Sequence, residues 1–294
     1  MKPARFAYAR PESVDEALDL LAAHGPGARP LAGGQSLVPW LNMRRIRVDA
    51  LVDITRLPGL DAARIADDEV RVGALVTQTA LEAAATPLPV VAECLPFTGH
   101  LATRNRGTVG GSIAHADPKG ELPLALLAAG GSAVVASSRR GQRTITADAL
   151  FTGPFETALA PDELVLEIRW PVPGPGEGEA FEELAQRQGD FTLASAACRV
   201  RLGDGHVAAA RVAAGAVADR PLLVPEAGEA LAGLPAGDDE AVARAAGAAG
   251  EAAAAAVPGI DDVHGSAAYR RHLTGALVRR AVTRALRRAA RTTP

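Results

Sequence analysis

The apolar residues nearest the N-terminus recur with the spacing of a helix between strands. From residue 14 to 21 they fall at i, i+3, i+4 and i+7, which places them on one helical face. The stretch Ser13 to Glu16 has the form of a capping box at the start of this helix, and Gly25 is suited to its end. Strand-like runs lie in RFAYARP, at 29–32 and at 51–54. The first 55 residues therefore predict a small βαβ unit.

Alternating apolar and polar residues in the middle of the chain predict antiparallel hairpins. One lies in ARIADDEVRVGA, with Asp67 and Asp68 at its turn, and another spans 132–145 around SRRGQ. Thr77 is suited to cap a helix that runs through Ala85, and a further helix is predicted to lead into FTGHLATRN. The run ELVLEIRWP predicts a strand that ends at its proline.

A segment rich in proline and glycine divides the chain. PVPGPGEGE, residues 171–179, has six such residues in nine and predicts the main domain boundary near residue 175. Beyond it, TLASAACRVRL and HVAAARVAAGAVA flank a turn at 203–205 and predict a long hairpin, which alanine-rich helices follow. We therefore expect three units, 1–55, 56–175 and 176–294.

Composition and charge exclude several kinds of partner. The chain of 294 residues is 48% hydrophobic and 22% charged, as in an ordinary globular protein with room for two or three domains. A net charge of −3 and a pI near 6.1 provide no attraction toward nucleic acid or an anionic membrane. No apolar run approaches the roughly 18 residues of a membrane span. We expect a cytoplasmic chain with no nucleic-acid partner and no integral membrane segment.

Cysteine is scarce, which bears on metal sites. Cys94 and Cys198 are the two cysteines and lie far apart in the sequence. An iron-sulfur cluster or a structural zinc needs about four ligands. We assign no metal site to this chain and expect any metal centre of the system to lie in another chain.

Two glycine pairs are the strongest candidate chemistry. The pair 33–34 lies in PLAGGQSLVPWLN and the pair 110–111 in TRNRGTVGGSIAHADPKGELP, and each is followed closely by a serine. Glycine lets a ligand reach the backbone N–H groups, and successive amides form a nest suited to phosphate oxygens. One pair alone is equally explained by a tight strand-to-helix turn, but two suggest two clamps on one diphosphate. Arg104 and Arg106 either add charge near the second pair or are solvated.

The common nucleotide and hydrolase motifs do not occur. There is no G-x-G-x-x-G after a strand and no G-x-x-x-x-G-K-[ST], so neither a Rossmann fold nor a P-loop is predicted. A G-x-S-x-G nucleophile elbow is also missing. The diphosphate would have to be held by another fold.

Four ordered stretches carry a specific resemblance: LAGGQSLVPWLNMR, RNRGTVGGSIAHADPKGELP, QRQGDFTLASAA and AAYRRHLTGALVRRAV. Over essentially its whole length the chain resembles the FAD-carrying medium subunit of molybdenum hydroxylases, a family that includes aerobic carbon monoxide dehydrogenase and bacterial xanthine dehydrogenase-type complexes. The resemblance implies an α+β fold. A two-subdomain FAD-binding region of the PCMH, or vanillyl-alcohol oxidase-like, type would precede a domain like the carbon monoxide dehydrogenase flavoprotein C-terminal domain, an antiparallel sheet with helices.

The resemblance also implies which residues hold FAD. Residues 32–36 and 108–112 would wrap the diphosphate with backbone amides and hydroxyls. Glu121 stands where relatives carry an acidic residue, although the dipole of the helix that follows also favours a carboxylate there. Asp190 matches a segment that relatives bring up to the isoalloxazine ring, or it is a turn aspartate after Gly189. The implied cofactor-binding set is Leu31, Ala32, Gly33, Gly34, Gln35, Ser36, Leu37, Thr108, Val109, Gly110, Gly111, Ser112, Asp117, Glu121 and Asp190.

Other residues near these motifs fit the family less directly. Some relatives have a lysine upstream of the third motif that touches FAD, but this chain has Glu182 and Glu183 there, so that contact is not transferred. Trp40 either shields part of the cofactor or, the simpler interpretation, packs in the core. His100 and His115 flank the second glycine pair and are expected to be structural, because the cofactor carries the redox chemistry. We assign no catalytic residue to this chain.

The last helix is basic. Such a helix can bind nucleic acid or a membrane surface, but in an acidic chain a solvated face with an apolar stripe packed beneath it is the simpler interpretation. Contact with a partner subunit stays open. The arginines are Arg270, Arg271, Arg279, Arg280, Arg284, Arg287, Arg288 and Arg291.

The resemblance implies a division of labour among subunits. A large subunit with the molybdenum cofactor would oxidise the substrate, and a small subunit would carry two [2Fe-2S] clusters. The FAD of this chain would take electrons from those clusters and pass them to an external acceptor, within a dimer of heterotrimers. The isolated chain is then expected to bind FAD without oxidising the physiological substrate. Two alternatives stay open: a self-sufficient FAD-dependent oxidase or dehydrogenase, and a non-redox module that binds a nucleotide diphosphate.

Overall fold

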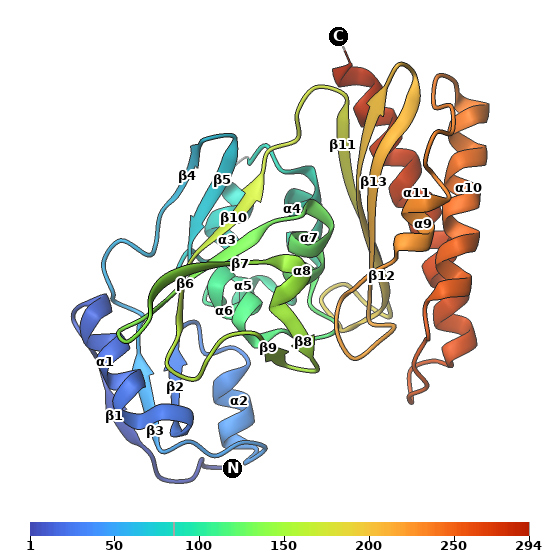
Figure 1. The fold of residues 1–294 in the computed structure, drawn as a ribbon. Coiled ribbons are helices and arrows are strands. Elements are labelled where there is room, and N and C mark those ends of the chain that lie inside the picture. The colour runs from blue at the N-terminus through green and yellow to red at the C-terminus, as the bar shows by residue number, and fades with distance from the viewer. Residues whose placement is uncertain (85, 294) are drawn as a thin grey trace.

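Three main sheets follow one another in chain order along the molecule (Figure 1). The computed structural model describes residues 1–84 and 86–293. The N-terminal sheet lies at the lower left of Figure 1, the middle sheet above it, and the C-terminal sheet at the right with two long helices on its outer side. The predicted α+β class is confirmed.

The N-terminal region is a parallel sheet crossed by one helix. Its elements are β1 (Ala7–Ala9), α1 (Val14–His24), the 3-10 turn η1 (Gly25–Gly27), β2 (Ala28–Leu31), α2 (Leu37–Asn42) and β3 (Ala50–Asp53). The strand order is β1-β3-β2, and α1 connects β1 to β2. The hydroxyl of Ser13 accepts a hydrogen bond from the amide of Glu16 at 3.1 Å, and Gly25 ends the helix with a φ of 54°. The predicted strands and helix are confirmed.

The middle region is a five-stranded antiparallel sheet. Its strands in spatial order are β4 (Ala63–Ala66), β5 (Glu69–Gly73), β10 (Leu164–Pro171), β6 (Ser132–Ser137) and β7 (Gly141–Thr146). Strand β10 lies between two hairpins and pairs with both. Asp67 and Asp68 have φ values of 52° and 59°, the conformation of a tight hairpin turn. Both predicted hairpins and the strand that ends at a proline are confirmed.

Short helices cover this middle sheet. They are α3 (Gln78–Ala83), α4 (Pro89–Cys94), the 3-10 turn η2 (Leu95–Phe97), α5 (Leu101–Arg104), α6 (Val109–His115), α7 (Glu121–Ala129) and α8 (Ala147–Leu150), with two short strands, β8 (Phe151–Gly153) and β9 (Glu156–Thr157). Thr77 caps α3 as predicted, because its hydroxyl accepts from the amide of Ala80 at 3.2 Å. The predicted helix end at Ala85 lies outside the described residues.

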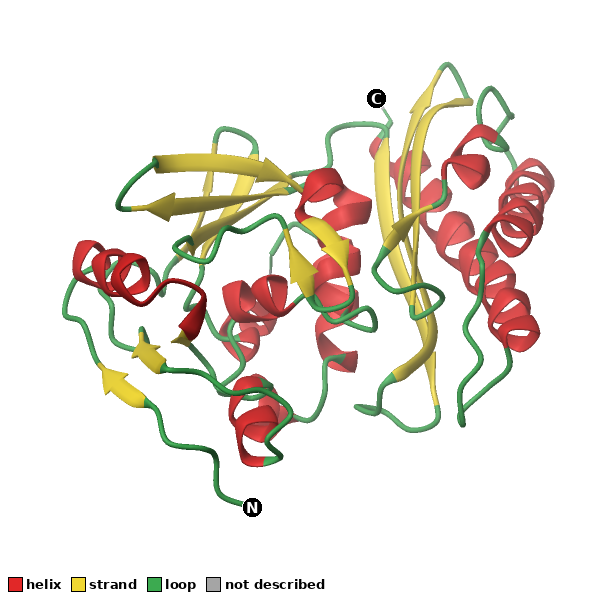
Figure 2. Cartoon of the chain, turned by 60° about the horizontal axis from the view of Figure 1, so that its bottom comes forward, coloured by secondary structure: helices red, strands yellow, loops and turns green. Residues whose placement is uncertain are grey.

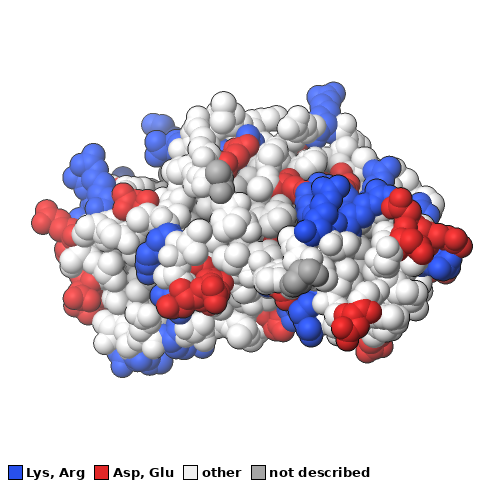
Figure 3. Space-filling view, turned by 90° about the horizontal axis from the view of Figure 1, so that it is seen from above, with Lys and Arg blue, Asp and Glu red and all other residues white. Residues whose placement is uncertain are grey.

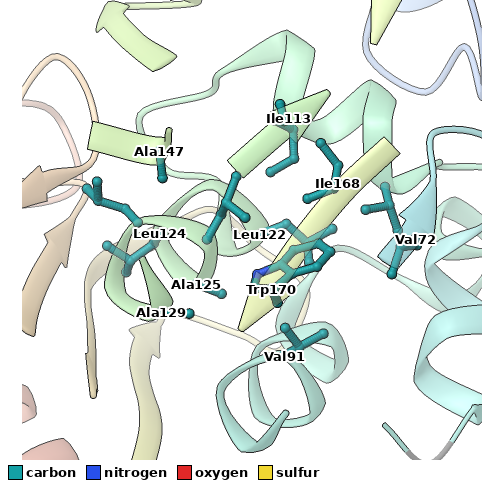
Figure 4. Close-up of a cluster of buried hydrophobic side chains, with 14 of the residues drawn as sticks. Val72, Val91, Ile113, Leu122, Leu124, Ala125, Ala129, Ala147, Ile168 and Trp170 are labelled. Atoms are coloured by element: carbon teal, nitrogen blue, oxygen red, sulfur yellow. The ribbon is translucent and has the colours of Figure 1, made fainter. Parts of the chain in front are cut away.

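Helix α7 is buried on every side. It lies between the middle sheet and the long strands of the C-terminal sheet, which explains why ELPLALLAA has no polar face (Figure 2). Figure 4 shows Leu122 of this helix beside Ile168 and Trp170 of the sheet, with Leu124 on the opposite side of the helix. This core holds the second glycine loop, which precedes α7, against a rigid layer.

The C-terminal region is an antiparallel sheet with helices on its outer face. Its elements are β11 (Glu177–Ala185), β12 (Thr192–Gly203), β13 (His206–Gly215), β14 (Leu222–Leu223), α9 (Pro225–Glu229), α10 (Asp239–Ala256) and α11 (Ala267–Thr292). The predicted hairpin and helices are confirmed, but the sequence did not predict β11. The chain crosses between sheets at 172–176, inside the segment predicted as a boundary. The limits at 55 and 175 stay a prediction.

The prediction that the arginines of α11 form a solvated face is wrong for Arg270, while Arg284 and Arg288 are partly exposed but engaged in ion pairs. Arg270 is fully buried, and Arg284 and Arg288 both bind Glu93 of α4. Figure 3, seen from above the view of Figure 1, shows basic and acidic side chains mixed on the upper face of the molecule. In the part of the chain that the structure describes, each helix is too short or too polar to cross a bilayer.

Candidate functional site

A cavity of about 1240 Å³ lies among the N-terminal region, helices α6 and α7, and the connection from β11 to β12. All residues of the predicted cofactor-binding set line it except Leu31 and Val109. Leu31 packs instead against the small cluster around Leu41, and Val109 is fully buried in the main core. The two glycine pairs, remote in sequence, therefore lie on one cavity.

The two glycine loops touch each other. A Cβ atom built on Gly33 would lie 2.1 Å from the carbonyl oxygen of Arg106, just before the second loop. A Cβ on Gly111 would lie 3.7 Å from that of Ala32. Gly34 has a φ of 72°, in the left-handed region that favours glycine. The loops thus form one continuous stretch of cavity wall.

Backbone hydrogen bonding differs between the two loops. Every amide from 109 to 112 donates to an acceptor of the chain at 2.9 to 3.0 Å, namely the carbonyls of Val76, Ala74 and Thr108 and the hydroxyl of Thr108. For the amides from 33 to 36, no acceptor exists among the residues that the structure describes. The predicted nest of free amides therefore occurs in the first loop, whereas the second presents a closed helical turn.

The second glycine pair is also explained in part by packing. A Cβ on Gly110 would lie 2.5 Å from that of Ala74 and closer than 3.0 Å to its backbone. Thr108 caps α6 through the amide of Gly111. Ser112 lines the cavity, as does Ser36 in the first loop. These two serines place hydroxyl groups on the cavity, and Gln35 and Thr108 are further polar residues of the loops that line it.

The C-terminal wall of the cavity is the loop between β11 and β12. Gly189 has a φ of 84°, and its backbone lies against residues 99–100, since a Cβ there would lie 2.7 Å from Nδ1 of His100. The amide of Asp190 donates to the carbonyl of Arg187 at 3.1 Å, so this residue is both a turn aspartate and a cavity residue. Phe191, which sequence reasoning gave no role, lines the cavity and is 73% exposed. The sequence signal that could have indicated this role is an aromatic residue two positions after a glycine, in QGDFT.

Trp40 is not a core residue, contrary to the simpler interpretation of the sequence. Its ring lies 5.0 Å from that of His115 and 4.9 Å from that of Phe155, centre to centre, and all three line the cavity. Burial lowers the pKa of His115, although the charge of Asp117 opposes this shift. The neutral imidazole is thus one wall of an aromatic cluster. Its members come from distant segments, so the sequence alone gave no signal for it.

Glu121 begins α7 and its side chain is almost fully buried beside the cavity. Burial raises its pKa to about 7, with smaller opposing effects that include the charge of Arg104. Nearby, Asp117 accepts a hydrogen bond from the amide of Lys119 at 2.9 Å and so stabilises the turn before the helix. The two acidic residues of the second motif therefore differ: Asp117 shapes the loop, and Glu121 holds a buried carboxyl group at the cavity.

The two arginines near the second glycine pair do not supply charge to the cavity. Arg104 is buried and donates to Glu82 at 2.9 Å and to the carbonyl of Gly99 at 3.0 Å. The side chain of Arg106 is exposed and does not line the cavity. Arg29 and Lys119 are the lysine and arginine residues that do line it, and Lys119 pairs with Asp262 at 3.4 Å.

Both parts of the chain match known families. Residues 4–173 match the family described as the FAD binding domain in molybdopterin dehydrogenase. Residues 179–285 match the CO dehydrogenase flavoprotein C-terminal domain. The resemblance inferred from the four motifs, and the architecture that it implied, are confirmed.

Individual proteins are similar over nearly the whole chain. The nicotine 6-hydroxylase medium subunit of Paenarthrobacter nicotinovorans is 39% identical over 288 residues, which cover 97% of this chain and 99% of that one. The carbon monoxide dehydrogenase medium chain of Afipia carboxidovorans is 37% identical over 292 residues, covering 98% and 99%. Carbon monoxide dehydrogenase from Hydrogenophaga pseudoflava matches in structure with a TM-score of 0.91 and 36% identity, covering 98% and 99%.

Proposed function

This chain belongs to the family of FAD-binding medium subunits of molybdenum hydroxylases, and we propose that it is the electron-transfer subunit of such a complex. It takes electrons from the [2Fe-2S] clusters of a small subunit and passes them to an external acceptor. A large subunit with the molybdenum cofactor oxidises the substrate. The observation that carries this proposal is the contact of the two glycine loops along one cavity.

The residues on the cavity fit FAD. Its volume of about 1240 Å³ exceeds the usual range of small-ligand pockets, as an elongated dinucleotide requires. The amides of residues 33–36 and the hydroxyls of Ser36 and Ser112 supply hydrogen-bond donors for a diphosphate. Asp190 and Glu121 both line the cavity, and the resemblance implies that the segment with Asp190 meets the isoalloxazine ring. When bound, FAD supplies the redox chemistry, and these residues bind and orient it.

The cysteines support the assignment of the clusters to another subunit. Cys94 and Cys198 are both buried, and burial raises the pKa of each thiol well above its usual value. An iron-sulfur cluster binds the thiolate form, which burial disfavours here. The names medium subunit and medium chain of the relatives are in keeping with partner subunits. We propose a dimer of heterotrimers in the cytoplasm.

An absorption spectrum tests this function. The purified chain, mixed with FAD and passed through gel filtration, should retain flavin bands. Those bands should bleach on addition of the substrate only when the large and small subunits are present. Bleaching by substrate in the isolated chain would instead support a self-sufficient oxidase or dehydrogenase. Tight ADP binding without retained FAD would support a non-redox nucleotide module.

A further inference from the structure

Strand β11 directs alternate carboxyl groups toward the FAD-binding region, and their hydrogen bonding declines along the strand. Glu177 accepts from Arg199 at 2.5 Å and from the amide of Gly174 at 2.9 Å. Glu179 is fully buried and lies 3.5 Å from Arg199. Glu183 has both carboxyl oxygens sealed from solvent, and no hydrogen-bond partner for either exists within residues 1–84 and 86–293. Glu183 is therefore an orphaned acid at the end of the strand nearest the cavity loop.

The neighbour of Glu183 is another buried carboxyl group. Glu121 of α7 acts on it electrostatically, and that side chain lines the cavity. Burial first, and then the charge of Glu121, raise the pKa of Glu183 to about 9. Two carboxylates that share a poorly solvated site do not both ionise, so the pair titrates as a unit.

No cation in the described chain is left to neutralise Glu183. Arg199 of β12 is engaged by Glu177 and Glu179, while Arg284 and Arg288 of α11 both bind Glu93. Apart from Glu121, the titratable groups that face β11 from the elements packed on it are paired or neutral. These groups are Glu93, Cys94, Cys198, Arg199, Arg284 and Arg288. On the cavity side, the negative charge of Asp117 raises the pKa of Glu121, and the positive charge of Arg104 lowers it.

We propose that Glu121 and Glu183 form a proton-holding carboxyl pair that couples the filling of the cavity by FAD to the uptake of a proton from solvent. Glu183 is a positioning residue. It stays a neutral acid and provides no positive charge that would stabilise the carboxylate of Glu121. Glu121 is the member of the pair that reaches the cavity. A ligand that displaces cavity water removes the remaining solvation of its carboxylate, which then binds a solvent proton and becomes a carboxylic acid. The coupling rests on the proposed function, because FAD is the ligand that fills the cavity.

Calorimetric titration of FAD into the apo chain tests the coupling. Performed at one pH in two buffers of different ionisation enthalpy, it counts the protons exchanged on binding. We expect uptake of up to one proton per FAD near pH 7 to 8, and an affinity for FAD that falls up to tenfold per pH unit in this range. Glu121→Gln, which cannot take up the proton, should abolish both effects.

A neighbouring glutamate provides the matched control. Glu182 lies next to Glu183 but on the opposite face of β11, where it pairs with Arg284 at 2.5 Å. Glu182→Gln should leave the proton count unchanged. Glu183→Gln should keep the uptake near pH 7. It should remove the further loss of FAD affinity that we expect of the wild-type chain above pH 9, where Glu183 ionises beside the cavity. If Glu183 had only a structural role, Glu183→Gln would not change the pH profile of FAD affinity.

An infrared spectrum of the apo chain checks the pair without any cofactor. At pH 8, where burial raises the pKa of Glu121 and of Glu179 only to about 7, the wild-type chain should show the C=O band of a buried carboxylic acid, and Glu183→Gln should remove most of it. FAD binding without proton uptake, or a spectrum without that band, would overturn the inference while leaving the proposed function intact. Failure of the wild-type chain to bind FAD at every pH would overturn the proposed function, and the coupling with it.

Discussion

The carbonyl oxygen of Arg106 lies where a side chain on Gly33 would have to be, since a Cβ there would approach it to 2.1 Å. The two loops on the cavity are therefore interlocked through their backbones before any ligand is considered. Gly33 is glycine because of this contact, and the cavity wall depends on it.

Gly33→Ala should destabilise the fold and, through it, the site. The added methyl group forces apart two backbones in a packed region, and we expect a loss of roughly 2 kcal/mol in the free energy of unfolding. Chemical denaturation of the apo chain measures it. Gly237→Ala is the matched control, because nothing lies within 4 Å of its Cβ position. Equal stability of the two variants would contradict the interlocked loops.

Ser112→Asp should weaken FAD binding without weakening the fold. A carboxylate on the cavity wall repels the diphosphate, and we expect at least a tenfold loss of affinity, or about 1.4 kcal/mol. Fluorescence titration of FAD measures the affinity, and thermal unfolding of the apo chain should be unchanged. Ser138→Asp, in the exposed turn between β6 and β7, adds the same charge away from the cavity and should bind FAD normally.

The sequence located the site but not the roles of its residues. Turn residues such as Asp67 and caps such as Ser13 and Thr77 act locally, so hairpins and helices could be predicted from short stretches. The glycine pairs pointed to one cavity. That the second loop uses its amides internally depends on Ala74 and Val76, which are remote in sequence.

Long-range contacts explain the elements that were not predicted. In the sequence β11 looks like an acidic loop and not a strand. Glutamates, at 177, 179 and 183, occupy the face that packs on the FAD-binding region, where a strand usually has apolar residues. Their burial depends on Arg199 of the next strand and on α4 and α7. Arg270 likewise looks like one charge among many in α11, and its burial appears only when the sheet and the loop at 257–266 surround it.

Helix α10 offers two glycines with opposite expected effects. A Cβ on Gly250 would lie 2.6 Å from the carbonyl oxygen of Gly275 in α11, so Gly250→Ala should cost roughly 2 kcal/mol of stability. Nothing lies within 4 Å of the Cβ position of Gly247, so Gly247→Ala should add about 0.5 to 1 kcal/mol through helix propensity. Denaturant midpoints of the two variants compare them directly. Stabilisation by both would show that the helices do not cross at this point.

Asp262→Asn should destabilise the chain at neutral pH. Asp262 accepts two hydrogen bonds at 2.8 Å from Arg270, which is fully buried, and loss of its charge leaves that guanidinium without a counter-ion. We expect a cost of about 2 kcal/mol, reduced from that of a sealed pair because Asp262 is partly exposed.

The pH dependence of this ion pair has a definite sign. Burial opposes ionisation of Asp262, but the amide of His264 and the charges of Arg270 and Lys119 outweigh it and lower the pKa to about 2. The stabilisation is present above the ordinary value of 3.8 and is lost as the pH falls through about 2. The gap between wild type and Asp262→Asn in urea denaturation should therefore close at low pH. Asp219→Asn, in an exposed ion pair with Arg220, should show almost no gap at any pH.

Glu183→Gln should stabilise the chain at alkaline pH and have little effect in acid. Burial raises the folded-state pKa of Glu183 from the ordinary 4.5 to about 9, so between these values the folded chain holds a proton that the unfolded chain has released. The stability of the wild-type chain is therefore fully present below pH 4.5 and declines as the pH rises toward 9. The glutamine variant has no proton to hold and lacks this decline.

The variant should exceed wild type by roughly 2 kcal/mol or more near pH 8 and by almost nothing near pH 4. Urea denaturation at both pH values measures the difference. Glu182→Gln, which loses only an ion pair with Arg284, should differ from wild type by a similar amount at pH 6 and pH 8. A constant offset for Glu183→Gln would mean that Glu183 is ionised in the folded chain. A stability gain of Glu183→Gln that grows with pH would mean that the folded wild-type chain holds a proton on Glu183, in the interior beside Glu121.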